Sequence, residues 1–305
     1  MMSRKTRTLL AVAVAAAFIG YRALQPAAGD RDATANAKPA AVAPLQPTLL
    51  GKIAFKPCSL SSSMTRDSLE AQCARFEVPE DRARPNGRKI ALNIAWLQAT
   101  ANGEVMPDPV FFLAGGPGQS AVETFPGLNP VFREVRKQRH VILVDQRGTG
   151  KSNLLSCPAP KEQAAEATLT PEAMQAQASA CVAALSNKAD LRHYTTTDAV
   201  ADLEAVRQAI GAAQLNLVGV SYGTRVAQQY AMRHPQATRS IVLDSVVPNA
   251  QGLGNIFARN LDDALALQFG VCSKDPACKA KLGDPRAELD RLLLTLRAAP
   301  PTVHY

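Results

Sequence analysis

The sequence predicts an α/β fold with a mostly parallel sheet and flanking helices, and three observations support this. Short runs rich in Val, Ile, Leu or Phe, typical of strands, recur along the chain. Segments with a helical apolar period separate the later runs, and strands joined through helices are usually parallel. With 305 residues and 47% hydrophobic content, the chain can bury one large core. We therefore expect ligands to bind beyond the carboxyl ends of the strands.

Five segments are predicted as strands, at residues 90–97, 110–113, 141–144, 215–220 and 240–243. The last four are short and apolar, so we expect each of them to be buried on both faces. A helix of about 198–210 precedes the fourth of these strands, with Thr197 or Asp198 expected as its N-cap. This alternation is the pattern of strands connected by crossover helices.

Further helices are predicted on either side of the last strand. One begins directly after Ser221 and ends near Arg233, because Pro235 forbids its continuation. Two more, at about 255–271 and 286–297, follow the last strand and are not expected to return to the sheet. The chain is therefore expected to end in a separate helical segment.

The beginning of the chain has the features of an export signal. Within residues 1–29, three basic residues precede an apolar stretch at 9–20, and small residues follow it. This stretch has 12 residues, whereas a membrane-spanning helix needs about 20, so a cleaved signal is favoured over a permanent anchor. Residues 30–48 are rich in Ala and Pro and are expected to form a flexible linker. The folded core is then expected at 49–250, and the helical segment at 251–305.

Export predicts a secreted or periplasmic protein, with no stable membrane partner unless the signal stays attached. The signal carries four basic residues and no acid, so its removal lowers the formal charge from +8 to +4. No long basic block remains, and nucleic acid is therefore not an expected partner.

The six cysteines form an even set in a chain that is expected to leave the cytoplasm, which favours disulfides. Neighbours in sequence give the simplest pairing: Cys58 with Cys73, Cys157 with Cys181, and Cys272 with Cys278. No C-x-x-C motif occurs and no histidine lies at ligand spacing, so no metal site is expected.

The run G-V-S-Y-G at residues 219–223 has the pattern of a nucleophile elbow. A serine hydroxyl is a weak nucleophile unless it is exposed next to a base, and the sharp strand-to-helix turn supplies the exposure. Gly219 and Gly223 are required because a Cβ at either position would clash across the turn. A predicted strand precedes Ser221 and a predicted helix follows it, which is the context that the motif demands. Ser221 is therefore the expected nucleophile.

Acyl transfer also needs hydrogen-bond donors for the oxyanion that develops on the carbonyl oxygen. The backbone N–H of Tyr222 lies at the expected helix N-terminus and is the first predicted donor. The second is assigned to Gly116, within the cluster A-G-G-P-G at 114–118 that directly follows a strand. A nucleotide-binding alternative rests on G-K-S at 150–152, but Asp145 stands where the phosphate-binding loop requires glycine.

Four motifs together resemble the proline iminopeptidase and tripeptidyl aminopeptidase family of secreted α/β-hydrolases: L-A-G-G-P-G-Q-S at 113–120, D-Q-R-G-T-G-K-S at 145–152, G-V-S-Y-G-T at 219–224 and L-D-S-V-V-P at 243–248. The resemblance implies the α/β-hydrolase fold, with residues 251–305 as the start of a helical cap. It also implies hydrolysis of amides at the amino end of short peptides without a cofactor. Some members carry histidine where this chain has Ala114, which points to the tripeptidyl branch.

In α/β-hydrolases the catalytic acid and histidine follow the serine in the chain. Of the four histidines, His140, His193 and His234 are expected to be structural, and His304 is the penultimate residue. Asp244 follows the strand after the elbow, where a few hydrolases place their triad acid, but the resemblance implies that it forms a structural turn.

Asp145 is expected to brace its loop with Arg147 rather than to perform chemistry. We therefore expect a C-terminally truncated chain whose triad acid and histidine lie beyond residue 305. In such a chain the strand at 240–243 would be an open sheet edge.

Two other functions remain open on the sequence. A carboxylesterase or lipase would use the same elbow on an ester instead of a peptide. Alternatively, the chain is an inactive remnant, because loss of the triad removes most of the catalytic rate.

Overall fold

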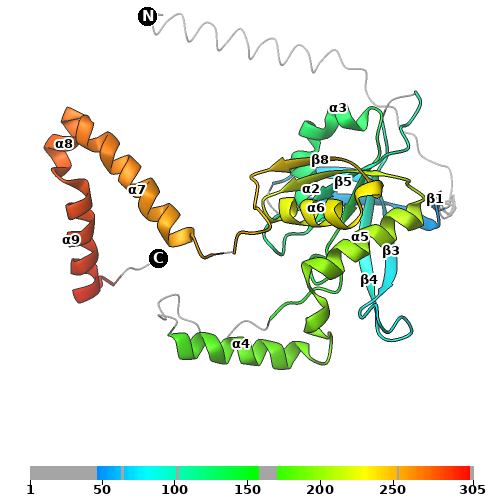
Figure 1. Cartoon of the computed structure of the whole chain (residues 1–305), viewed down its shortest axis with the longest axis horizontal. Helices are drawn as coiled ribbons and strands as arrows, with labels where there is room; N and C mark the ends of the chain where they lie inside the picture. The colour runs from blue at the N-terminus through cyan, green and yellow to red at the C-terminus, as the bar shows by residue number, and fades with distance from the viewer. Residues whose placement is uncertain (1–46, 63–64, 101–102, 158–169, 253, 303–305) are drawn as a thin grey trace, which may run out of the picture. The chain divides into compact units, whose positions relative to one another are not determined.

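The structure is a computed structural model that describes residues 47–62, 65–100, 103–157, 170–252 and 254–302 (Figure 1). The predicted export signal, nearly all of the predicted linker and His304 lie outside these residues.

An eight-stranded sheet forms the centre of the fold, in the order β1-β2-β3-β4-β6-β5-β7-β8. Its strands are β1 (Thr48–Leu50), β2 (Ile53–Ser61), β3 (Ser68–Pro79), β4 (Lys89–Leu97), β5 (Val110–Leu113), β6 (Val141–Val144), β7 (Leu215–Val220) and β8 (Thr238–Asp244). Strands β6, β5, β7 and β8 are parallel, as predicted, whereas the pairs from β1 to β4 and the pair β4–β6 are antiparallel. The three N-terminal strands were not predicted.

Burial differs among the four parallel strands. Every residue of β5 and β6 is buried, and β7 is buried over most of its length, as expected. The same expectation is wrong for β8, where Ile241 is 39% exposed and Val242 is 55% exposed. These residues are exposed because β8 is the outermost strand and pairs only with β7 within the described part of the sheet. The expected open edge at this strand is therefore present in the described structure.

The described helices are α2 (Ala121–Leu128), α3 (Arg133–Arg136), α4 (Pro171–Leu185), α5 (Thr196–Ile210), α6 (Tyr222–Arg233), α7 (Phe257–Lys274), α8 (Pro276–Leu282) and α9 (Pro285–Ala298), with short 3₁₀ segments η1 (Asn129–Phe132), η2 (Leu191–His193) and η3 (Pro235–Ala237). Helix α5 starts earlier than predicted, because Thr195 and not Thr197 or Asp198 is its N-cap. Thr195 and Asp198 form a capping box, in which each side chain accepts a hydrogen bond from the backbone of the other.

Each face of the sheet has its own hydrophobic core. Phe111 of β5 belongs to the core beneath α5 and α6, which Figure 1 shows on one side of the sheet. Its neighbour Phe112 points to the opposite core, beneath α2. There its ring centroid lies 5.6 Å from that of Phe125 and 5.9 Å from that of Phe132. Strand β5 is therefore packed from both sides, and Ala114, directly after it, belongs to the second core.

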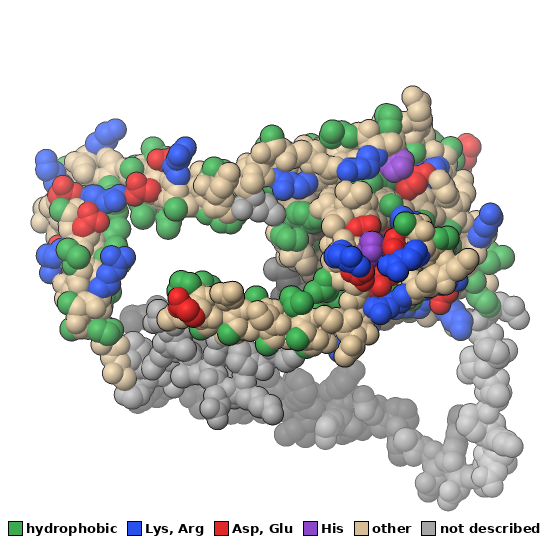
Figure 2. Space-filling view, turned by 60° about the horizontal axis from the view of Figure 1, so that its bottom comes forward, with side chains coloured by type: hydrophobic (Ala, Val, Ile, Leu, Met, Phe, Trp, Pro, Cys, Tyr) green, Lys and Arg blue, Asp and Glu red, His purple; other side chains and the backbone are tan. Residues whose placement is uncertain are grey.

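Helices α7, α8 and α9 form a segment whose internal contacts include an ion pair of 2.7 Å between Arg286 and Asp262. The sequence predicted two helices here, and the short α8 was missed. Apolar side chains are exposed on this segment, among them Phe257 (61%) and Leu261 (63%), and Figure 2 shows such side chains between charged ones on the molecular surface. Within the described residues, we find no helix that is both long and apolar enough to cross a membrane.

All three predicted disulfides are present. Cys58–Cys73 joins β2 to β3, Cys157–Cys181 ties α4 to the segment after β6, and Cys272–Cys278 joins α7 to α8. The pairing by sequence proximity is therefore confirmed.

Candidate active site

Ser221 lies at the sharp turn between β7 and α6, at the carboxyl end of the parallel strands. Its backbone angles are φ 55° and ψ −121°, a combination that residues with a side chain rarely adopt. The turn is held by a 2.9 Å hydrogen bond from the Ser221 amide to the Asp244 carbonyl oxygen. Strain of this kind persists only where surrounding contacts enforce it, and it presents the Ser221 side chain at the end of the sheet.

The two elbow glycines are required for the reason that the sequence suggested. A Cβ added to Gly219 would overlap the carbonyl group of Gly223, across the turn. A Cβ added to Gly223 would overlap the carbonyl oxygens of Leu113 and Ala114, at the end of β5. The first helical residues of α6 therefore lie directly against the start of the glycine loop.

The glycine loop at residues 114–118 runs past the nucleophile. A Cβ added to Gly115 would lie 3.1 Å from the Cβ of Ser221. Gly116 has φ +101°, a conformation that favours glycine, and a Cβ there would lie 2.7 Å from the Gly118 amide nitrogen. Tyr222 is the first residue of α6, and its side-chain hydroxyl is 2.6 Å from Thr196 Oγ1. The fold thus brings the loop of Gly116 and the residue Tyr222 to Ser221, while the donor role of their amides stays a prediction.

Asp145 follows β6 and is almost completely buried, with an exposed fraction of 1%. The expectation that it pairs with Arg147 is wrong. Its carboxylate instead accepts hydrogen bonds from Ser120, Val122, Asn93 and Lys151. The sequence contained a signal for the first of these contacts, because Ser120 and Asp145 follow neighbouring parallel strands and so lie at one edge of the sheet.

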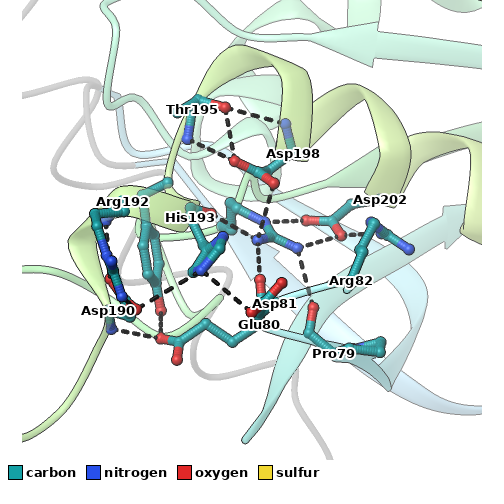
Figure 3. A network of polar contacts seen from close by, with 12 residues as sticks. Pro79, Glu80, Asp81, Arg82, Asp190, Arg192, His193, Thr195, Asp198 and Asp202 are labelled. Carbon is teal, nitrogen blue, oxygen red and sulfur yellow. Dashed lines mark hydrogen bonds and ion pairs between the residues drawn. The ribbon is translucent and has the colours of Figure 1, made fainter. Parts of the chain in front are cut away.

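Arg147 turns the other way and forms a separate buried network, drawn in Figure 3. Its guanidinium group donates two hydrogen bonds of 2.7 Å to the Asp202 carboxylate on α5. It also donates to the carbonyl oxygens of Glu80 (2.8 Å) and His193 (2.6 Å). Burial opposes the positive charge, but the bonds to Asp202 prevail and raise the pKa of Arg147. This network joins the loop after β6 to α5 and to the end of β3.

Each histidine in the described part of the chain has structural partners, and none is hydrogen-bonded to Ser221 there. His140 accepts a hydrogen bond of 3.0 Å from the Ala99 amide, and burial lowers its pKa. His193 Nε2 lies 3.6 Å from an oxygen of Asp81 (Figure 3), and the ring centroid of His234 lies 5.0 Å from that of Tyr230, with the two rings tilted.

Two further expectations concern Asp244 and metals. The Asp244 side chain accepts a hydrogen bond of 3.0 Å from Ser245, as fits a turn at the end of β8. Among the described residues, no group of His, Cys, Asp and Glu side chains is arranged to hold a metal ion.

Comparison with known proteins identifies the family. The model of the alpha/beta hydrolase fold family matches residues 108–268, slightly more than half of the 305-residue chain. A tripeptidyl aminopeptidase of Streptomyces lividans is 30% identical, over 96% of this chain and 57% of the relative. The serine protease Hip1 of Mycobacterium tuberculosis is 29% identical, over 76% of this chain and 47% of that protein. A proline iminopeptidase of Neisseria gonorrhoeae is 29% identical, over 45% of this chain and 32% of that protein.

This chain spans about half the length of the curated relatives that it matches. The resemblance to the proline iminopeptidase and tripeptidyl aminopeptidase family is nevertheless confirmed by these relatives, and the matched region contains both the glycine loop and the elbow. With its parallel strands, its turn at Ser221 and this match, the chain belongs to the α/β hydrolase fold family.

Proposed function

We propose that this chain carries the nucleophile of a serine peptidase that cleaves amide bonds near the amino end of short peptides. The observation that carries the proposal is the geometry of Ser221, a serine in a strained turn between a buried strand and a helix. The glycine loop that passes beside its Cβ supplies the second part of an acyl-transfer site.

In the proposed reaction, Ser221 Oγ attacks the substrate carbonyl carbon while a general base takes the hydroxyl proton. The new C–O bond moves the carbonyl electron pair onto oxygen, and the amides of Gly116 and Tyr222 hydrogen-bond this oxyanion. Tyr222 is suited to the role because the first N–H groups of a helix have no partner within the helix. As the intermediate collapses, the C–N bond breaks and the base returns the proton to the leaving amine; water then attacks the acyl-serine, which releases the acid and restores the Ser221 hydroxyl.

The general base of this proposal lies outside the described residues. His140, His193 and His234 are engaged with Ala99, Asp81 and Tyr230, respectively, and not with Ser221. A base is necessary because the oxyanion donors and substrate binding alone give only a small part of the rate of such enzymes.

The names of the relatives support the substrate class. Two of them are a tripeptidyl aminopeptidase and a proline iminopeptidase, and a third is a serine protease. We therefore propose short peptides as substrates and interpret α7, α8 and α9 as the start of a cap, within the helical segment at 251–305. The hydrolase core would then cover residues 49–250.

The compartment is proposed from the disulfides. Three disulfides in one chain are typical of oxidising surroundings outside the cytoplasm. We accordingly propose that residues 1–29 direct export to the periplasm or the medium, with 30–48 as the linker.

The test is substrate preference, measured on the protein produced from its complete gene. We expect a tripeptidyl 4-nitroanilide or a prolyl 4-nitroanilide to be hydrolysed with higher kcat/KM than 4-nitrophenyl butyrate. The matched variant Ser221→Ala should lose this activity by several orders of magnitude. Faster turnover of the ester would show a carboxylesterase instead, and equal activity of Ser221→Ala would contradict the role of Ser221.

A further inference from the structure

We propose that Asp145 is a positioning residue that fixes the segment from the glycine loop at 114–118 to Ser120 in the geometry required of an oxyanion donor. The inference deepens the proposed function and rests on it for the catalytic consequence. Its structural part, which does not depend on catalysis, concerns the hydrogen bonds by which the buried Asp145 carboxylate joins neighbouring segments.

One oxygen of Asp145 holds the residues that directly follow the glycine loop. Oδ1 accepts a hydrogen bond of 2.6 Å from Ser120 Oγ and one of 3.1 Å from the Val122 amide. Ser120 is also the N-cap of α2, since its Oγ accepts a hydrogen bond of 3.0 Å from the Glu123 amide. The carboxylate therefore fixes the point where the loop of Gly116 turns into a helix.

The other oxygen of Asp145 is anchored in the sheet and in its own loop. Oδ2 accepts hydrogen bonds of 2.9 Å from Asn93 Nδ2 and of 3.1 Å from the Lys151 amide. Asn93 lies in β4, and its carbonyl oxygen accepts a hydrogen bond of 3.0 Å from the Asp145 amide. A Cβ added to Gly150 would overlap the carboxyl group and lie 2.9 Å from Ser120 Cβ, so the loop packs tightly around both residues.

These four donors define what Asp145 does. Two hydrogen bonds at each oxygen use the hydrogen-bonding capacity of a carboxylate almost completely. All four donors belong to uncharged groups, so within the described structure Asp145 is not the partner of a cation. A carboxylate bound in this way is suited to fixing backbone positions and not to orienting a catalytic histidine.

Asp145 is expected to affect the catalytic rate because an oxyanion donor tolerates only a small displacement. An oxyanion donor must lie within hydrogen-bond distance of the oxygen in the transition state, and a shift of about 1 Å can cost about 100-fold in rate. In Asp145→Asn, one carboxylate oxygen becomes an NH₂ group. That group faces either the Val122 amide or the Lys151 amide, so one backbone donor loses its acceptor.

The structural part is tested on the 305-residue chain by hydrogen–deuterium exchange. We expect Asp145→Asn to accelerate exchange of the amides at 114–122 by at least about tenfold, because their anchoring opens more readily. The matched control is Asp108→Asn, another buried carboxylate, which binds Asn216 and Arg139 at the amino end of β5. Unchanged exchange at 114–122 in Asp145→Asn, or equal acceleration in Asp108→Asn, would overturn the inference.

The catalytic part is tested by kinetics on the protein produced from its complete gene. For the tripeptidyl 4-nitroanilide, Asp145→Asn should lower kcat by about 10- to 100-fold with KM changed by less than about threefold. Asp108→Asn should keep kcat within about threefold even where it lowers the melting temperature equally. A kcat of Asp145→Asn within threefold of the wild type would overturn the positioning role. Inactivity of the wild-type protein would instead refute the proposed function, leaving the exchange experiment to decide the structural part.

Discussion

Replacement of Asp202 by asparagine should destabilise the fold far more than removal of an exposed ion pair. The side chains of Arg147 and Asp202 are only 1% and 2% exposed, and Arg82 donates a further hydrogen bond of 2.5 Å to Asp202. The variant keeps the shape of the side chain but removes the charge that balances the buried guanidinium group (Figure 3). The buried Arg147 cation would then keep only the more distant Asp198 carboxylate, 4.0 Å away, as an anionic partner.

The expected loss of stability follows from the burial of the Arg147–Asp202 pair. Removing one partner of a buried ion pair costs about 3–5 kcal/mol, and we take the lower value because asparagine retains one acceptor. For a domain of this size, each kcal/mol lowers the melting temperature by about 2–4 °C. Asp202→Asn should therefore melt about 6–12 °C below the wild type in calorimetry at neutral pH.

Glu288→Gln is the matched control, since it removes a carboxylate whose partner Arg291 is 68% exposed on α9. Exposed pairs contribute little to stability, so this variant should melt within about 1 °C of the wild type. If Asp202→Asn also melts within about 1 °C of the wild type, the network around Arg147 contributes little to the stability of the fold.

Three further predictions follow from local contacts. Gly219→Ala should destabilise the protein by about 1–3 kcal/mol and abolish the reactivity of Ser221, because the added Cβ overlaps the Gly223 carbonyl group. Thermal unfolding measures the first effect, and labelling with a fluorophosphonate probe measures the second. Thr195→Ala should cost about 1 kcal/mol in urea unfolding, because α5 loses its N-cap. Burial would raise the pKa of Glu204, but hydrogen bonds from neighbours including Arg207 lower it to about 2. Its stabilising effect should therefore be complete above about pH 4.5 and fall towards pH 2, so the melting temperatures of wild type and Glu204→Gln should converge over this range.

The elements nearest the catalytic chemistry were predictable because their signals are local. Strands β5 and β6 are short and fully apolar, β7 carries Asn216 as its one polar side chain, and the elbow needs its glycines within one turn. The disulfides also followed from sequence neighbours. Such features depend on only a few adjacent residues.

Strands β1, β2 and β3, in the antiparallel part of the sheet, were missed because they lack a continuous apolar run. In β3, buried and exposed residues are mixed along 12 residues, and charged side chains such as Glu70 and Arg75 lie within it. Helix α4 was missed for a related reason, since Leu185 is its only residue that is buried in the described structure. Its start did carry a signal, because the Thr170 side chain accepts a hydrogen bond from the Ala173 amide and Pro171 follows it.

The partners of Asp145 and Arg147 could not be predicted from spacing alone. The two residues are two positions apart, yet Asp145 points to the glycine loop and Arg147 to α5. Which way each side chain turns depends on the packing of segments that are 25 and 55 residues away in sequence. The sequence did place both residues beyond the carboxyl end of a strand, where the functional loops meet.

Whether Ser221 is an activated nucleophile is best tested by covalent labelling. The protein produced from its complete gene is treated with a fluorophosphonate probe, digested and analysed by mass spectrometry, with Ser221→Ala as the control. We expect one adduct, on the peptide containing Ser221, and none in the variant. An adduct on another residue, equal labelling of Ser221→Ala, or no adduct on the folded wild-type protein would contradict it.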